Sequence, residues 1–232
     1  MILLCLDTSG PVAGVALMEN GVIRYEAMVV NAFTHSQSIL PMVEEAYLHT
    51  GLNVEQTDFF AVTVGPGSFT GVRIGVSTVN GLAHGVGKPC IAVDALESMA
   101  AGVMPYPGVI CPIQDARAGQ VYGAAFAGQT LRRLMEDQPI KLEDYADAIA
   151  PLGNEFLFLG DGMPVHREKI AALMGEKARF APAHLSFLRP ASAAFLAAQK
   201  TREAVSYLDL KPLYLRPPQA ERQKNLREMN HV

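Results

Sequence analysis

Three short turns combine an acidic residue with small, hydroxylated or basic neighbours that could bind a phosphate group or a metal ion. Asp7-Thr8-Ser9-Gly10, Asp115-Ala116-Arg117 and Gly160-Asp161-Gly162 each follow an apolar run that is typical of a β-strand. The backbone N–H groups of such a turn can bind phosphate, and its carboxylate can hold a magnesium ion. The candidate nucleotide- or phosphate-binding residues are therefore Asp7, Thr8, Ser9, Asp115, Arg117 and Asp161.

The same turns also have simpler structural explanations. Asp7 and Ser9 could form an Asx-turn that satisfies only the backbone of their own hairpin, and Asp115 could pair with the neighbouring Arg117. The turn around Asp161 could serve only to reverse the chain, without binding a ligand. Because ligands also gather at the carboxyl ends of strands in α/β sheets, both explanations stay open from the sequence.

A glycine-rich block, residues 65–75, follows another apolar run and begins a helical pattern. A strand, a glycine turn and a helix N-terminus together form a geometry that often binds an anion. However, the block lacks the lysine of a Walker loop, and Thr70 stands where a dinucleotide-binding fingerprint starting at Gly65 needs glycine. The block therefore matches no standard nucleotide-binding motif.

The helical pattern after this block contains interior glycines, each of which costs about 0.5–1 kcal/mol relative to alanine. Gly71 and Gly75 share one stripe with Thr78 and Leu82, and a separate stripe of the same helix is apolar. We expect the glycine stripe either to admit a helix of a binding partner at close range or to pack inside the domain.

The sequence indicates no catalytic residue and no metal site. No two of the six histidines share an expected helix at metal-ligand spacing. Ser68 has neither a G-x-S-x-G context nor a neighbouring base. The three cysteines lie far apart in apolar runs, so we expect them to be buried free thiols: Cys5, Cys90 and Cys111.

The elements that must position the three turns follow from the hydrophobic periodicity. Residues 2–7, 12–18 and 22–30 predict a three-stranded meander, with Asn20-Gly21 in a two-residue hairpin turn. The remainder of the first half predicts helices and strands in alternation, at residues 35–48, 59–64, 70–84, 89–93 and 94–101.

The second half repeats this alternation more loosely. It predicts two strands, a charged stretch, a third strand and two helices, at residues 109–114, 119–127, 155–159, 165–174 and 191–204. We therefore expect two α/β subdomains with mixed sheets, at residues 1–104 and 105–216. Residues 217–232 are predicted to be a flexible tail.

The composition is that of an ordinary globular protein. Of 232 residues, 50% are hydrophobic and 18% are charged, and no apolar run approaches the roughly 18 residues of a membrane span. The N-terminus has no basic region before its apolar run, so we expect a cytoplasmic protein without membrane contact. A net charge of −4 argues against a broad surface for binding a polyanion.

Taken as a set, several motifs resemble the bacterial TsaB (YeaZ) family. They occur in the family's order, cover nearly the whole chain and lie at residues 2–9, 35–41, 65–75, 115–122, 160–162 and 212–216. The block at 65–75 is the most specific of them. The resemblance implies an actin/hexokinase/Hsp70-like (ASKHA) fold, with two α/β subdomains around a cleft, and this agrees with the two halves derived above.

The resemblance also implies a role in making N6-threonylcarbamoyladenosine at position 37 of tRNAs that read codons beginning with A. In that pathway TsaD, a metal-binding paralogue, transfers the threonylcarbamoyl group. TsaB is the partner of TsaD, and the small ATPase TsaE joins them. The implied partners are thus TsaD, TsaE and, through the complex, tRNA. The isolated chain could form a homodimer, and ATP or ADP could bind within the complex.

One departure from the catalytic paralogue concerns its metal. The paralogue is expected to hold the ion with two histidines of one helix, and the corresponding positions here are Ala95 and Met99. Alanine has no donor atom, and a thioether is a poor ligand for a hard or borderline ion. We therefore expect no metal or cofactor bound by this chain alone, and no catalytic activity without its partners.

The resemblance places the helices near residues 35–48 and 70–84 at the interface with TsaD. The interface residues that it implies are His35, Ile39, Val43, Gly71, Ile74, Gly75, Thr78 and Leu82. On this hypothesis Gly75→Leu abolishes TsaD binding and leaves the monomer folded.

Two alternative functions remain from the sequence. One is a phosphotransferase or ATPase of the same fold that uses Asp7 and Asp115 around a magnesium nucleotide. The other is an M22-type metallopeptidase, although its required pair of metal ligands is missing here.

Overall fold

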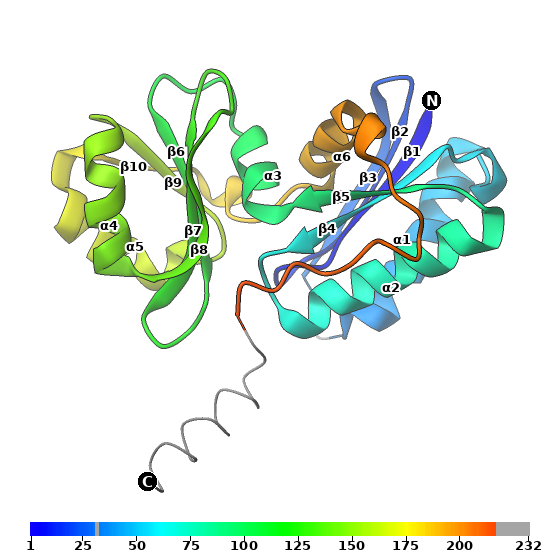
Figure 1. Ribbon diagram of the computed structural model, residues 1–232, viewed down its shortest axis with the longest axis horizontal. Coiled ribbons are helices and arrows are strands. Elements are labelled where there is room, and N and C mark those ends of the chain that lie inside the picture. Colours follow the sequence, from blue (N-terminus) through cyan, green and yellow to red (C-terminus); the bar gives the residue numbers. More distant parts are fainter. Residues whose placement is uncertain (31–32, 217–232) are drawn as a thin grey trace, which may run out of the picture.

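The computed structural model describes residues 1–30 and 33–216, so the predicted tail at 217–232 lies outside the described residues. Two lobes lie side by side, and each is built on a five-stranded mixed sheet (Figure 1). The first sheet has the order β3-β2-β1-β4-β5. Its strands are β1 (Ile2–Asp7), β2 (Ala13–Glu19), β3 (Val22–Val29), β4 (Phe59–Gly65) and β5 (Cys90–Asp94).

The second sheet has the order β10-β9-β6-β7-β8. Its strands are β6 (Val109–Asp115), β7 (Gln120–Ala127), β8 (Arg133–Lys141), β9 (Phe156–Leu159) and β10 (Ala178–Phe180). In both sheets an antiparallel meander of three strands is followed by two strands that pair in parallel on the other side of the first one. The two halves therefore share one topology, as the repeated alternation in the sequence predicts.

The predicted hairpin turn at Asn20-Gly21 is confirmed. Asn20 has a φ of 50° and Gly21 a φ of 82°, the two positive values that a two-residue turn between β2 and β3 needs.

Three elements of the second half were not predicted from the sequence: β8, β10 and the helix α4 (Leu142–Ile149). They lie in stretches that were described from the sequence only as charged or were left unassigned. Strand β8 was missed because it is an edge strand whose charged residues and Pro139 interrupt the apolar alternation.

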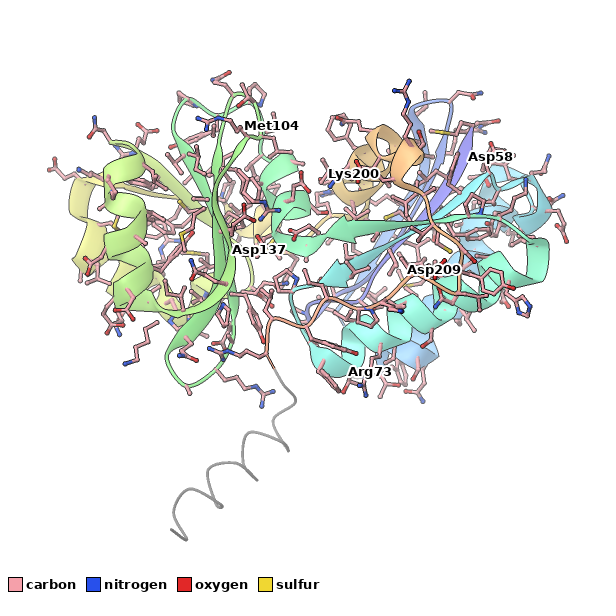
Figure 2. All side chains as sticks on the ribbon, in the orientation of Figure 1. Asp58, Arg73, Met104, Asp137, Lys200 and Asp209 are labelled. Carbon is pink, nitrogen blue, oxygen red and sulfur yellow. The ribbon has the colours of Figure 1, made fainter. Side chains whose placement is uncertain are left out.

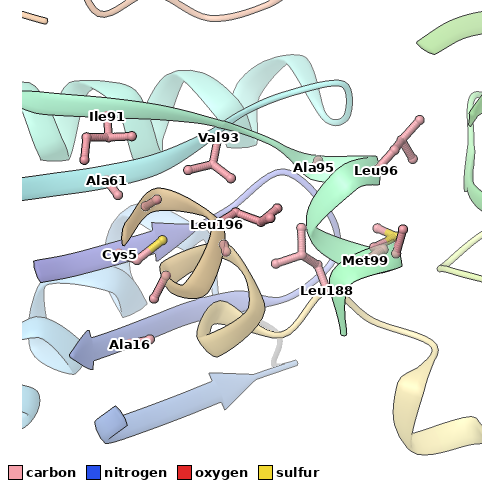
Figure 3. Packing of buried hydrophobic residues seen from close by; sticks show 14 of the residues in the cluster. Cys5, Ala16, Ala61, Ile91, Val93, Ala95, Leu96, Met99, Leu188 and Leu196 are labelled. Atoms are coloured by element: carbon pink, nitrogen blue, oxygen red, sulfur yellow. The ribbon is translucent and has the colours of Figure 1, made fainter. Parts of the chain in front are cut away.

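Two helix layers enclose the first sheet. Helices α1 (His35–Thr50) and α2 (Phe69–Val86) cover one face, where they bury Leu4 and Leu6 of β1. Helices α3 (Ala95–Ala101) and α6 (Pro190–Gln199) cover the other face, where they bury Leu3 and Cys5. Figure 3 shows Cys5 within this packing. Alternate residues of one strand point to opposite faces, so β1 is buried on both sides.

The end of the described chain returns to the first lobe. Helix α6 lies within the 105–216 stretch that the sequence assigns to the second half, yet it packs against β1 and β2 of the first sheet. In the second lobe, α4 and α5 (Met163–Met174) cover one face of the sheet, and α3 lies against β6 and β7 on the other. Within the described residues, no helix is both long enough and apolar enough to cross a bilayer.

Candidate functional site

The three acidic turns predicted from the sequence meet at one cleft between the lobes. The cleft has a volume of about 580 Å³, and Ser9, Asp115, Arg117 and Asp161 line it. Asp7 and Thr8 lie directly behind Ser9 and are buried, at 1% and 0% exposure. The turns come from strand ends that are far apart in sequence, and the shared topology of the two sheets brings them to one place.

Asp7 has one satisfied and one unsatisfied carboxylate oxygen. Its Oδ1 accepts hydrogen bonds from the Ser9 N–H (3.0 Å), the Ser9 hydroxyl (2.7 Å) and the Thr63 hydroxyl. Its Oδ2 is buried without a protein partner among the described residues. Burial raises the pKa of Asp7, although these hydrogen bonds oppose the shift. The Asx-turn at Asp7 is therefore present, but it satisfies only one of the two carboxylate oxygens.

Two further side chains that line the cleft carry buried polar atoms without a hydrogen-bond partner among the described residues: Gln114 and Asp161. The Nε2 of His166, which lies outside the cleft lining, is also buried without a hydrogen bond. Asp7, Gln114 and Asp161 also enclose a small cavity of about 10 Å³. Burial, and to a smaller extent the charges of Asp115 and Asp7, raise the pKa of Asp161 to about 7. Buried polar atoms are nearly always paired in proteins, so this cluster makes the cleft floor a candidate binding site.

The sequence predictions missed Gln114 and His166. Gln114 gave a signal that could have been used, because it is a polar residue at the end of an otherwise apolar strand, beside Asp115. His166 gave none, because its position in α5 does not show that its Nε2 lies 3.4 Å from Asp115 Oδ1.

The β6–β7 turn holds its residues in an uncommon conformation. Arg117, Ala118 and Gly119 have φ values of 63°, 52° and 72°, which cost roughly 1–2 kcal/mol for each residue other than glycine. The carboxylate of Asp115 accepts a hydrogen bond from the Arg117 N–H at 2.9 Å, so its contact with Arg117 is to the backbone and the predicted side-chain ion pair is not what holds this turn.

The glycine block forms one wall of the cleft and packs mainly against its own chain. The Ser68 N–H donates to the Ser9 carbonyl at 2.7 Å, and the Ser68 hydroxyl accepts from the Gly71 N–H at 3.2 Å as the N-cap of α2. Gly67, with a φ of 155°, lies so close to the Ser9 carbonyl that a Cβ would overlap it. The start of α2 therefore faces the cleft, which is the arrangement that favours an anion.

The expectation that the glycine stripe admits a partner helix is wrong for Gly71 and Gly75. A Cβ at Gly71 would overlap the carbonyl of Thr8, and a Cβ at Gly75 would overlap the Thr8 hydroxyl and lie 3.0 Å from Val62 Cγ2. Both glycines thus let α2 approach β1 and β4 of its own lobe. The periodicity identified the stripe correctly, but the stripe faces inward.

The other residues implied at the interface fall into two groups. Ile39 and Val43 are almost completely buried in the core of the first lobe, at 1% and 3% exposure. Half-buried residues remain along the two helices: His35, Ile74, Thr78 and Leu82. His35 is held at the cleft rim, with Nε2 2.9 Å from the Gly10 carbonyl.

The two positions that the resemblance assigns to the paralogue's metal-binding histidines lie in apolar packing. Ala95 and Met99 are 0% and 5% exposed and belong to the cluster between α3, α6 and the first sheet (Figure 3). Met99 also borders the small cavity beside Asp7 and Asp161. Among the described residues, no three His, Cys, Asp or Glu side chains are grouped as metal ligands. Ala95 has no donor atom and the Met99 thioether is a poor ligand for a hard or borderline ion.

Comparisons with known proteins find relatives that match nearly the whole chain. Residues 30–224 match the sequence profile of the family described as TsaD, tRNA N6-adenosine threonylcarbamoyltransferase. The tRNA threonylcarbamoyladenosine biosynthesis protein TsaB of Bacillus subtilis is 33% identical over 223 residues, which span 95% of this chain and 96% of that protein.

Solved structures agree as well. A crystal structure from Pseudomonas aeruginosa, of a protein described as similar to the peptidase YeaZ, has a TM-score of 0.77 and 27% identity, and covers 93% of this chain and 99% of that one. The ROK hexokinase of Thermus thermophilus shares the fold alone, with a TM-score of 0.53 and 11% identity over 86% of this chain and 99% of that one. The predicted fold class is therefore confirmed.

Proposed function

This chain belongs to the TsaB family, and from that premise we propose that it is a non-catalytic partner subunit in the formation of N6-threonylcarbamoyladenosine at position 37 of tRNAs reading codons that begin with A. In this proposal it supports threonylcarbamoyl transfer by TsaD and does not perform the transfer. The observation that carries the proposal is the burial of Ala95 and Met99 in apolar packing, where a catalytic paralogue needs two metal ligands.

A reconstituted modification assay tests this division of labour. Purified chain, TsaD, TsaE, ATP and threonylcarbamoyl-adenylate are combined with unmodified tRNA, and each protein is left out in turn. We expect modification to need both this chain and TsaD. Modified tRNA formed by this chain in the absence of TsaD would overturn the proposal.

We place the contact with TsaD on the outer side of α1 and α2. A groove of about 600 Å³ lies there and is lined mainly by Leu40, Tyr47, Leu48, Leu52 and Leu82. Leu48 is 77% exposed, and exposed apolar surface of this kind is typical of a protein–protein interface. In the absence of TsaD, the same face is proposed to pair two copies of this chain, and TsaE is proposed to join the complex with TsaD.

A charge substitution in this groove tests the contact. Leu48→Arg is expected to abolish co-elution with TsaD while the Tm stays unchanged, because the side chain is exposed. Val165→Arg is the matched control, since Val165 is 66% exposed on α5 in the other lobe. Retained co-elution of Leu48→Arg would move the interface elsewhere.

We further propose that the cleft binds a nucleotide phosphate within the complex. The N-terminus of α2 and Arg117, both of which line the cleft, would hold the phosphate, whereas the carboxylates of Asp7 and Asp161 would repel it unless a cation lay between. Calorimetric titration of ATP and ADP into the TsaD complex tests this, with Arg117→Ala expected to weaken binding. Equal affinity of that variant would refute this placement.

A further inference from the structure

The last described segment of the chain, residues 205–216, forms a belt along the first lobe. At its start, Val205 exchanges two backbone hydrogen bonds of 2.8 Å with Cys90 at the end of the sheet. Leu210 is 3% exposed in the core beneath α2, and the Leu213 N–H donates to the Val64 carbonyl at 2.7 Å. Figure 1 shows this belt running beside α2 toward the space between the lobes.

The belt is fixed to the first two turns of α2 by three side chains that pack on one another. The Tyr214 ring lies 4.6 Å from the Phe69 ring, and the Arg73 guanidinium lies 3.8 Å from the centre of the Phe69 ring. Arg73 Nε donates to the Tyr214 hydroxyl at 2.6 Å. Arg73 lies on the exposed side of α2 (Figure 2), so this stack anchors the belt at the lobe's surface.

Two residues later the belt reaches the other lobe. Arg216 donates from Nη1 to the Ala116 carbonyl at 3.3 Å and from Nη2 to the Gln120 side chain. Its guanidinium also lies 5.6 Å from the centre of the Tyr122 ring. Ala116 and Gln120 bracket the β6–β7 turn, in which Arg117 and Ala118 have left-handed conformations.

The anchor on one lobe, Tyr214, and the contacts on the other, made by Arg216, are only two residues apart in sequence. Residues 213–216 line the cleft together with both lobes, so a wider cleft requires either the Arg216 contacts or the Tyr214 stack to break. We propose that residues 213–216 are a clasp that holds the two lobes together across the cleft and limits how far the cleft opens. Releasing the clasp gives ligands access to the buried polar atoms of Asp7, Gln114 and Asp161.

The glycine that begins the 65–75 block fits this role. Gly65 has a φ of 120°, and a Cβ there would lie 2.7 Å from the Leu213 carbonyl oxygen. Only a residue without a side chain lets the belt pass this close to the end of β4. The first glycine of the block therefore makes room for the clasp.

A distance measurement between the lobes tests the clasp in the full-length chain. The three native cysteines are buried, so spin labels can be attached selectively to Ser77→Cys on α2 and Asp147→Cys on α4, both exposed positions. The labelled chain is mixed with an excess of unlabelled chain, so that distances between two labelled copies do not contribute to the measurement. We expect one narrow distance distribution in the parent chain.

In the Arg216→Ala background the distribution is expected to broaden and its mean to lengthen by several ångströms. Adding Tyr214→Ala is expected to increase both changes, because the anchor is then lost as well. Arg202→Ala is the matched control, since Arg202 is an exposed arginine in the turn that precedes the belt, and it should leave the distribution unchanged.

Circular dichroism establishes that each variant is folded before it is measured. If the double variant Tyr214→Ala/Arg216→Ala is folded and gives the same distances as Arg202→Ala, the clasp does not restrain the lobes and the proposal is overturned. Arg216→Lys keeps the positive charge but lacks the planar guanidinium. If this variant gives the narrow distribution of the parent chain, a point charge is sufficient to hold the clasp. If it gives a broad distribution like that of Arg216→Ala, the two-pronged guanidinium is needed. Both results support the clasp.

Discussion

Gly75 provides the sharpest test of how α2 is packed. In Gly75→Ala, the new Cβ meets the Thr8 hydroxyl and Val62 Cγ2 inside the first lobe, and overpacking of this kind costs about 1–3 kcal/mol. Replacing a helix-interior glycine with alanine returns about 1 kcal/mol of helix propensity. The net effect is therefore a loss of about 0–2 kcal/mol in the free energy of unfolding.

Gly81→Ala on the same helix separates the two terms. A Cβ at Gly81 has no atom within 4 Å, so only the propensity gain remains and this variant should be stabilised by about 0.5–1 kcal/mol. The two variants should then differ by about 1–3 kcal/mol, or roughly 2–12 °C in Tm for a domain of this size.

Thermal and urea unfolding followed by circular dichroism measures this difference. If Gly75→Ala is stabilised as much as Gly81→Ala, Gly75 does not face the sheet tightly and the packing argument fails. The larger Gly75→Leu should unfold the monomer or lower its Tm further. This reverses the sequence-based expectation that it would block only partner binding.

Three further perturbations test the cleft and the second lobe. The pKa of Asp161 is raised from 3.8 to about 7, so the folded state retains a proton that the unfolded state has lost in this range. Its contribution to stability therefore falls as pH rises from about 4 to about 7, by up to about 1.4 kcal/mol per pH unit. Asp161→Asn should flatten a plot of Tm against pH, and an unchanged slope would contradict the raised pKa of Asp161. Ser68→Ala removes the N-cap of α2 and should lower the free energy of unfolding by about 1 kcal/mol in urea titration, whereas no change would show that the Gly71 N–H is satisfied elsewhere. Tyr145→Phe removes a buried hydrogen bond to the Ala124 carbonyl (2.6 Å) and should cost about 1–3 kcal/mol; a neutral result would mean that this carbonyl keeps another partner.

Much of the fold could be predicted because its signals are local. The first meander follows from alternating apolar residues and the Asn20-Gly21 turn, and the ends of α1 and α2 lie within two residues of the predicted ones. The duplicated topology follows from the same alternation in both halves. Strand β8 could not be predicted in this way, because an edge strand that is half solvated does not need an apolar pattern.

The sequence by itself determined that acidic turns follow three strands. Asp7, Asp115 and Asp161 were predicted as candidate site residues from their turns alone, because acidic residues at strand ends have a local signature. What only the tertiary structure decided is which surfaces face one another. Helical periodicity places Gly71 and Gly75 on one stripe, but it cannot say whether a partner or the helix's own sheet lies against that stripe. The meeting of Asp7 with Gln114 and Asp161, and of Arg216 with the β6–β7 turn, likewise depends on packing between segments distant in sequence, which leaves no pattern in the chain.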